Sequence, residues 1–345
     1  MNKKSVAILG ATGMVGRRFA ELLIDHPWFE IAMLVGSGTS VGETYESVWE
    51  TKETALQEHY GKDIWNTRPF PSQLRDRRIH DFEDIFDSGV DFVFSSVPER
   101  AGESERALLD HDFMVFSNSP YGRFEACNPL VVAEVNRQEM RGKRFIKNPN
   151  CVTSGLVLIL APLEQSYGIE EIAITTYQSL SGRGDAKYAK DLVIGNVYPL
   201  HGSSERTEIY IAKEVKKILQ KPTPLSVSCN RVGVQEGHYV DVRVKTTRAI
   251  RSEQEVIELF QSYNPLRDLD IPSNPESPLV VINEVGRPRP CQDAQHHGGI
   301  AVAVGNISVD DEVYSLRLTY VVNNLIRGAA GGAILNAETY FAACA

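Results

Sequence analysis

Near its start the chain reads VAILGATGMVG, at residues 6–16. The four apolar residues indicate a buried strand, and the glycines lie in a turn that leads into a helix through Leu23. Glycines at such a turn let backbone N–H groups approach a pyrophosphate at the helix N-terminus. The spacing is GxxGxxG rather than GxGxxG, so a tight turn without a ligand stays an alternative. The motif predicts a dinucleotide site formed by Gly10, Thr12, Gly13, Met14 and Val15.

Strands alternate with helices through the first third of the chain. Apolar runs predict strands at residues 29–35, 90–94 and 113–116, and residues 103–111 have a helical pattern, whereas residues 37–78 are predicted to be irregular. Such alternation requires crossover connections between neighbouring strands, so it indicates a parallel sheet. We therefore predict the α/β fold class, beginning with a Rossmann-like parallel sheet.

The rest of the chain has a different pattern. Several strand-like runs alternate polar and apolar side chains, as antiparallel strands with one solvated face do. They lie at residues 172–177, 226–234, 239–246 and 300–307. This pattern predicts an α+β domain. Residues 321–342 are rich in small side chains and predict a helix that returns to the first domain.

The size of the chain agrees with two domains. It has 345 residues, of which 42% are hydrophobic, and its formal net charge is −9. We expect an NAD(P)-binding domain of residues 1–134 with 322–345, and a catalytic and dimerisation domain of residues 135–321. The negative net charge argues against nucleic acid or an anionic membrane as a partner, which leaves a small-molecule substrate.

Five cysteines are spread along the chain without a CxxC pair. An odd and widely spaced set is typical of a reducing compartment without disulfides, and we expect no metal site. The strand-like run that begins at Ser5 leaves too little room for a signal peptide. No apolar run approaches the roughly 20 residues that span a bilayer. We therefore expect a cytoplasmic protein.

The loop after the second predicted strand bears on the choice of cofactor. NAD enzymes usually carry an Asp or Glu here to bind the ribose 2′-hydroxyl, but residues 36–40 are Gly-Ser-Gly-Thr-Ser. A neutral loop does not repel a 2′-phosphate, so the sequence favours NADP. The loop has no Arg or Lys to pair with that phosphate, so NAD stays possible. The expected cofactor residues in this loop are Ser37, Thr39 and Ser40.

Cys151 lies on a polar turn just before the apolar run of residues 155–160. A thiol at a helix start is close to the positive end of the helix dipole, which lowers its pKa and makes it nucleophilic. Backbone N–H groups of the same turn could also hold a developing oxyanion. The alternative is an inert buried cysteine, because free cysteine is among the most buried residue types.

Local sequence does not identify the partners of this thiol. His238 follows Gly237 between two strand-like runs, but a histidine on a hairpin turn is more often solvated than catalytic. Residues 178–184 have the composition of a glycine-rich loop at a site or of a surface turn. The sequence alone does not bring His238 to Cys151. Three arginines are candidate anion clamps because guanidinium pairs with carboxylate or phosphate in bidentate fashion: Arg123, Arg206 and Arg231.

Taken in order, these segments resemble aspartate-semialdehyde dehydrogenases of the type found in archaea and fungi. The resemblance runs over essentially the whole chain and implies a homodimer or a dimer of dimers. The matching segments are residues 10–16, 117–119 with Arg123, 129–136, 149–153, 178–184, Arg231 with residues 237–238, 287–290 and 324–332.

The resemblance implies a thioester mechanism. In the biosynthetic direction Cys151 attacks the acyl carbon of L-aspartyl 4-phosphate and expels phosphate, and reduction of the thioester gives L-aspartate 4-semialdehyde. His238 resembles the acid–base residue of the family. Gln178 resembles the residue that orients the acyl intermediate. Asn150 would stabilise the oxyanion together with the Cys151 N–H.

The resemblance also implies roles in binding. Arg231 matches the clamp on the substrate α-carboxylate, and Arg123 matches the phosphate-binding arginine. Glu205 would bind the amine, and Arg206 would replace a phosphate-contacting lysine. The residues expected at the nicotinamide end of the cofactor are Ser181, Gly182 and Asn324.

The chain departs from the family at a few positions. Residues 203–206 are Ser-Ser-Glu-Arg where the family commonly has Glu-Glu-Glu-Lys, Gly233 replaces a proline, Thr39 replaces an arginine that binds the 2′-phosphate, and Cys291 replaces another arginine. These changes concern the acyl substrate and the preference for NADP. One alternative is a paralogous acyl-CoA reductase, such as a malonyl-CoA reductase, and another is a catalytically inactive NAD(P)-binding protein.

Overall fold

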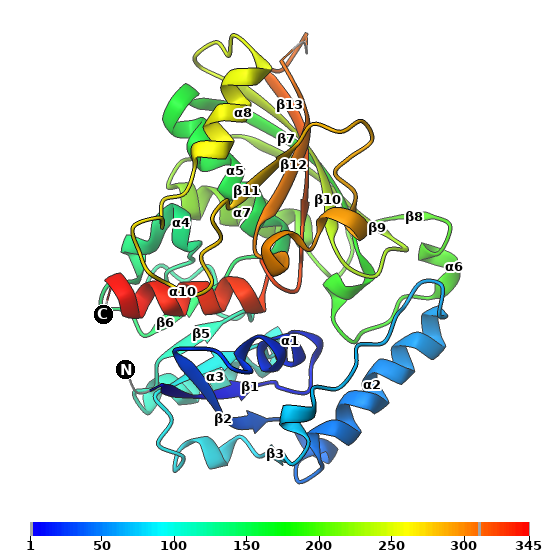
Figure 1. Cartoon of the computed structure of the whole chain (residues 1–345), viewed down its shortest axis with the longest axis vertical. Helices are drawn as coiled ribbons and strands as arrows, with labels where there is room; N and C mark the ends of the chain where they lie inside the picture. Colours follow the sequence, from blue (N-terminus) through cyan, green and yellow to red (C-terminus); the bar gives the residue numbers. More distant parts are fainter. Residues whose placement is uncertain (1–2, 310–311, 345) are drawn as a thin grey trace.

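The computed structural model describes residues 3–309 and 312–344, which form two β-sheets with their helices (Figure 1). The first sheet has six parallel strands in the order β3-β2-β1-β4-β5-β6. The predicted α/β class with a Rossmann-like parallel sheet is therefore confirmed. Its strands are β1 Lys4–Leu9, β2 Phe29–Val35, β3 Ile79–His80, β4 Phe92–Ser95, β5 Val115–Ser117 and β6 Phe145–Lys147.

Two helices far apart in the sequence lie side by side on this sheet (Figure 1). Helix α1 (Met14–Leu23) follows the glycine turn, and helix α10 (Ala330–Ala343) ends the described chain. Phe19 of α1 and Ile334 of α10 belong to one buried cluster with strand residues such as Phe94. The predicted return of the C-terminal helix to the first domain is confirmed. A further helix, α3 (Gly102–Asp110), precedes β5.

The C-terminal helix begins later than the predicted residue 321. The β-branched pair Val321 and Val322 extends a strand of the second sheet. Asn323 then forms a turn, because its side-chain oxygen accepts the N–H groups of Leu325 and Ile326. The helix starts only after this turn.

Residues 37–78 contain a long helix, α2 (Tyr45–Tyr60), where an irregular region was predicted. Thr44 caps it by accepting the N–H of Ser47. The helix buries Tyr45, Trp49 and Leu56 at helical spacing. The charged residues between these positions mask the apolar periodicity in the sequence. Figure 1 shows α2 (blue) reaching from the first sheet toward α6 of the second domain.

The second sheet has seven strands in the order β11-β12-β13-β10-β7-β9-β8. The pairs β7–β9 and β11–β12 are parallel and the other neighbours are antiparallel, so the sheet is mixed. Its strands are β7 Ile169–Gln178, β8 Val197–Pro199, β9 Leu225–Val232, β10 His238–Thr246, β11 Leu279–Ile282, β12 Val302–Ser308 and β13 Leu316–Val322.

Helices α5 (Cys151–Tyr167), α7 (Thr207–Leu219) and α8 (Glu253–Ser262) cover one face of this sheet (Figure 1). Their apolar sides form one large buried cluster with the strands. The opposite face carries half-buried side chains such as Tyr177 and Tyr239. Short helices complete the fold: α4 Ala133–Asn136, α6 Lys190–Val193 and α9 Pro290–Asp293.

The division of the chain at residues 134 and 321 stays a prediction. Strand β6 lies beyond the first of these positions but pairs with β5 in the first sheet. Within the described part of the chain, no helix is long and apolar enough to cross a membrane.

Candidate active site

A cavity of about 330 Å³ brings together eight of the nineteen predicted site residues. Its wall includes Val15 at the start of α1, Asn118 just after β5 and Cys151 at the start of α5. The loop that follows β7 contributes Ser181 and Gly182 to the same wall. The cavity therefore lies where the carboxyl ends of the first sheet meet the second domain, as ligand sites of open α/β sheets do.

Cys151 is the first residue of α5, as the sequence predicts. Asn150 caps the helix, because its side-chain oxygen accepts the Val152 N–H at 2.9 Å. The thiol is half-buried and faces the cavity. The helix N-terminus and the cap together fix the position of Sγ.

His238 lies against Cys151, with 3.1 Å between its Nε2 and Sγ. It is the first residue of β10 and is fully buried, not solvated. The preceding Gly237 has φ +93° and lies so close to Pro290 and Ala294 that a side chain would not fit. This glycine turn directs His238 inward toward the thiol.

The surroundings of the pair set its charge state. Burial raises the pKa of the Cys151 thiol to about 11, although Arg231 and the Val152 N–H act in the opposite direction. Burial and the Arg231 guanidinium hold the pKa of His238 well below its usual value. Both shifts favour the neutral forms of the two groups. The predicted lowering of the thiol pKa by the helix start is wrong as a net effect, because loss of solvation outweighs the helix N-terminus.

Gln178 is buried at the end of β7, and its amide donates to the hydroxyl of Thr176 at 3.1 Å. It lies one residue before Ser179, which contacts His238, but it is not part of the cavity wall. Gln178 is therefore buried outside the wall of this cavity.

Arg231 is buried and bound on three sides. Its guanidinium pairs with Glu205 at 2.6 Å and donates to the carbonyl oxygen of Ser179 at 2.7 Å. Its Nε donates to the hydroxyl of Tyr188 at 3.1 Å, and that hydroxyl donates to Glu205. Sequence reasoning missed Tyr188, whose loop has no local pattern that points to a site.

Arg123 is likewise held by a carboxylate. It pairs with Glu214 of α7 at 2.8 Å, and the other oxygen of Glu214 accepts the Asn150 N–H at 2.8 Å. Glu214 therefore joins the predicted phosphate arginine to the turn that carries the nucleophile. The sequence held a signal for it, since Glu214 falls in the buried stripe of α7 with Ile211 and Val215.

Arg206 is not brought to this cavity. It is exposed at the N-cap of α7 with φ +52° and is not among the residues of the wall. Glu205 and Tyr210, on either side of it in sequence, do line the cavity.

The residues of the glycine turn fit a dinucleotide. A side chain at Gly16 would meet the carbonyl oxygen of Gly10 at 2.1 Å, so the turn is as tight as the sequence predicts. Gly13 is the N-cap of α1 and the first helical turn has no acidic residue. The Gly13 N–H donates to the carbonyl oxygen of Gly10 at 3.0 Å, and the N–H groups of the first helical turn that follow are suited to a pyrophosphate.

The other predicted cofactor residues form two groups, one beyond the end of β2 and one at the loop that follows β7. A side chain on Gly36 would contact Ser40 at 2.8 Å and Thr12 at 3.3 Å, so these residues cluster beyond β2. Ser37 and Thr39 are exposed there. In the second group, the side-chain amide of Asn324 donates to the hydroxyl of Ser181 at 3.0 Å. Gly182 packs against His238.

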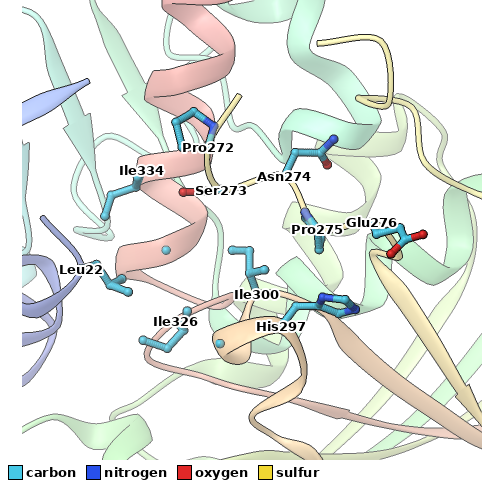
Figure 2. Close-up of a pocket in the computed structure, with 12 residues that line it drawn as sticks. Leu22, Pro272, Ser273, Asn274, Pro275, Glu276, His297, Ile300, Ile326 and Ile334 are labelled. Atoms are coloured by element: carbon cyan, nitrogen blue, oxygen red, sulfur yellow. The ribbon is translucent and has the colours of Figure 1, made fainter. Parts of the chain in front are cut away.

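A second cavity of about 380 Å³ is separate from this site (Figure 2). Figure 2 shows Leu22 of α1 and Ile334 of α10 across from Pro275 and His297. Its wall includes none of the predicted site residues. The turn after Asn324 divides the two cavities, because Ile326 lines this one while its neighbours Leu325 and Gly328 line the other.

Known sequence families match both parts of the chain. Residues 5–143 match the family described as semialdehyde dehydrogenase, NAD binding domain, and residues 160–327 match semialdehyde dehydrogenase, dimerisation domain. The chain belongs to the semialdehyde dehydrogenase family. The aspartate-semialdehyde dehydrogenase of Trichophyton rubrum is 33% identical to this chain, over 98% of the chain and 97% of the relative. The aspartate-semialdehyde dehydrogenase of Methanothermobacter thermautotrophicus is 32% identical, over 97% of the chain and 98% of the relative.

Other relatives of this semialdehyde dehydrogenase extend the comparison. A malonyl-CoA reductase (NADP) of Metallosphaera sedula is 31% identical over 96% of the chain and 95% of that protein. The crystal structure of the Candida albicans aspartate-semialdehyde dehydrogenase with NADP superposes with a TM-score of 0.84 at 29% identity, covering 99% of both chains. The resemblance to aspartate-semialdehyde dehydrogenases is confirmed. The protein is an oxidoreductase of this family with an NAD(P)-binding domain, and family membership leaves its acyl substrate open.

Proposed function

We propose that the protein catalyses the NADP-dependent reductive dephosphorylation of L-aspartyl 4-phosphate to L-aspartate 4-semialdehyde. This reaction would serve the biosynthesis of lysine, methionine and threonine. The observation that carries the proposal is the 3.1 Å contact between Cys151 and His238, beside a cavity that is also lined by Glu205, the partner of Arg231. A nucleophile, a hydrogen-bonding imidazole and a charge-matched recognition pair are what such a reaction needs.

The chemical steps use the start of α5. Sγ of Cys151 attacks the acyl carbon, the bond from carbon to the phosphate oxygen breaks, and a thioester remains on the protein. The Cys151 N–H and Asn150 would hold the oxyanion that develops in this step. The glycine turn and Asn324 would hold the reduced cofactor, NADPH, whose chemistry is to supply the hydride that the thioester needs. Collapse of the resulting hemithioacetal releases the semialdehyde and frees Cys151.

The Arg231–Glu205 pair supports an amino-acid substrate. An aspartyl group carries an ammonium and a carboxylate, so each member of the ion pair can bind the substrate group of opposite charge in place of its protein partner. Arg231 would take the α-carboxylate and Glu205 the ammonium. Arg123 would contact the phosphate, and Gln178 would orient the acyl group. Arg206 would add to phosphate binding only if it moved into the cavity.

The second candidate is a paralogous acyl-CoA reductase, such as a malonyl-CoA reductase, working through the same thioester. The position of Arg206 favours it, because the predicted second phosphate cation lies outside the cavity. A malonyl group has no ammonium, so Glu205 would have no substrate group to bind. A catalytically inactive NAD(P)-binding protein is a third possibility, which the Cys151–His238 contact argues against.

The preference for NADP and the oligomeric state are also part of the proposal. NADP is supported by the cofactor in the Candida albicans relative and by the neutral loop of residues 37–40. The match to a dimerisation domain supports a homo-oligomer, and we propose a homodimer or a dimer of dimers. The face of the second sheet that bears Tyr177 and Tyr239 is the expected contact. A cytoplasmic location stays a prediction from the sequence.

A steady-state assay separates the candidates. Oxidation of L-aspartate 4-semialdehyde is followed by NADPH absorbance with inorganic phosphate or with coenzyme A as the acyl acceptor. We expect fast turnover with phosphate and NADP, with the Cys151→Ser variant as the blank. Turnover only with coenzyme A and malonate semialdehyde would replace the first candidate by the second. Absence of turnover in both assays would favour the inactive protein.

A further inference from the structure

Three fully buried polar side chains meet where β5 and β6 end, outside the cavity wall. Nζ of Lys147, the last residue of β6, donates to Oγ of Ser117 at 2.6 Å and to Glu105 of α3 at 3.1 Å. The Ser117 hydroxyl, at the end of β5, donates to the other carboxylate oxygen of Glu105. The ammonium also lies 4.3 Å from the centroid of the Phe145 ring. We call Lys147, Glu105 and Ser117 the Lys147 cluster.

The Lys147 cluster is buried in apolar surroundings. Its neighbours along α3, β5 and β6 include Leu108, Val115 and Phe145, which share one buried apolar cluster. Burial lowers the pKa of Lys147 to about 8, although Glu105 acts in the opposite direction. A buried ion pair is often no more stabilising than apolar side chains of similar size, because both ions lose their hydration. The role of the cluster therefore follows from what it holds in place.

The Ser117 hydroxyl fixes the chain where β5 ends. Besides the ammonium, its oxygen accepts the N–H of Ser119 at 3.1 Å. Between these two serines lies Asn118, which lines the cavity. The carbonyl oxygen of Asn118 accepts the Arg123 guanidinium at 2.8 Å. The turn that Ser117 holds thus supplies a contact that orients the predicted phosphate arginine.

Lys147 fixes the chain where β6 ends. The N–H of the next residue, Asn148, donates to the carbonyl oxygen of Ser117 at 2.8 Å. The side-chain amide of Asn148 donates to the side-chain oxygen of Asn118 at 2.8 Å. Residues 149–151 then line the cavity and end at the nucleophile. The two chain ends are therefore joined through the Lys147 cluster and through Asn148, directly before the residues that face the cavity.

We propose that the Lys147 cluster is a positioning element that sets the turn of Arg123 against the helix start of Cys151. An acyl phosphate needs both at once, because its acyl carbon and its phosphorus share one bridging oxygen. A shift of one chain end against the other would hold the phosphate with the acyl carbon out of reach of Sγ. The cluster acts through the two chain ends, since its residues do not line the cavity. This inference rests on the phosphate role proposed above for Arg123.

Two variants of the full-length protein separate positioning from stability. Glu105→Leu with Lys147→Met replaces both charges by apolar groups of similar size, so folding should be kept. Ser117→Ala keeps the ion pair and removes only the hydroxyl that links it to the turn. Lys143→Met is the control, because Lys143 is an exposed lysine just before β6. Urea denaturation checks that each protein is folded under the assay conditions.

The kinetic test measures KM for phosphate and KM for NADP separately in the oxidation of L-aspartate 4-semialdehyde. In both cluster variants we expect KM for phosphate to rise about tenfold, with KM for NADP changed by about twofold or less. The Lys143→Met control should match the wild type in both constants. Equal changes in the two KM values, or a wild-type KM for phosphate in the folded variants, would overturn the inference.

Hydrogen exchange measured by mass spectrometry gives a readout that does not depend on the acyl acceptor. The peptide that contains residues 117–123 should exchange about threefold faster or more in both cluster variants, whereas β10 should be unchanged. An unchanged rate at residues 117–123 would show that the turn is held without the cluster, and would overturn the inference. If only coenzyme A supports turnover, the proposed function fails, and this exchange rate still decides whether the cluster positions the turn.

Discussion

The two ends of the candidate site are built from different interactions. At the chemical end, Cys151, His238, Ser179 and Asn324 are joined by hydrogen bonds between neutral groups. At the recognition end, buried charges are paired with each other, and the Arg231–Glu205 contact is the shortest of these pairs. The chemical end is therefore ready before substrate arrives, whereas the recognition end must exchange protein partners for substrate groups.

This difference separates two kinds of effect. Changes at the chemical end should lower kcat with little effect on stability, because no charge is left unpaired. Changes at the recognition end should alter KM or stability, because removal of one partner leaves a buried charge. The following four substitutions test this separation.

Cys151→Ser should have the largest effect. The hydroxyl is a far weaker nucleophile, so we expect kcat to fall by about 10⁴-fold or more, with unchanged unfolding. The measurement is kcat by NADPH absorbance together with a denaturation curve. Cys291→Ser is the matched control, since that thiol is exposed and outside the cavity, and its activity should be normal. Comparable loss in both variants would refute the assignment of the nucleophile.

Glu214→Ala should mainly reduce stability. It leaves Arg123 buried without its carboxylate and removes the acceptor of the Asn150 N–H, so the free energy of unfolding should fall by about 3–5 kcal/mol. Urea denaturation measures this loss. Exposed Lys216 lies on the same helix, so Lys216→Ala is the control. The double variant Arg123→Met with Glu214→Leu should recover part of the loss, and additive losses would contradict the pairing.

Arg231→Leu should raise KM for the semialdehyde. Loss of a charge-assisted contact to the α-carboxylate corresponds to about a 100-fold higher KM. The kcat should change less, because the variant keeps the Cys151–His238 contact. Initial rates over a range of semialdehyde concentrations give both constants, and Arg248→Leu serves as a remote, exposed control. A fall in kcat with KM unchanged would place Arg231 at the chemical end.

Tyr188→Phe should have the smallest effect. The hydroxyl links Arg231 and Glu205, and its loss should raise KM about five- to tenfold while the ring keeps its packing. The same rate measurements detect it, and Tyr198→Phe is a matched control on a neighbouring ring. A variant with unchanged KM would show that the pair holds its geometry without this hydroxyl.

Much of the fold follows from local sequence. The glycine turn at residues 10–16 predicts β1, α1 and the cofactor edge, because tight turns have a strict residue requirement. The helix α2 was missed, because three of its buried positions are separated by charged residues that hide a narrow apolar stripe. Its burial depends on packing against the first sheet and the loop of Tyr188, which local patterns do not contain.

The site was only partly accessible from sequence. Cys151 was found because a helix start has a local signature. Tyr188 was not, since two residues of α2 hold its backbone, Tyr60 by a hydroxyl contact to its N–H and His59 by a contact to its carbonyl oxygen. The thiol pKa was predicted in the wrong direction, because burial is a tertiary property that outweighs the local helix dipole.

The most direct test is to trap the acyl group on the protein. The protein is mixed with L-aspartate 4-semialdehyde and NADP without phosphate or coenzyme A, quenched in acid, digested and examined by mass spectrometry. We predict an aspartyl thioester on the peptide that contains Cys151, and its loss when phosphate is added before the quench. Phosphate-dependent turnover without this adduct, or an adduct on another cysteine, would contradict the account.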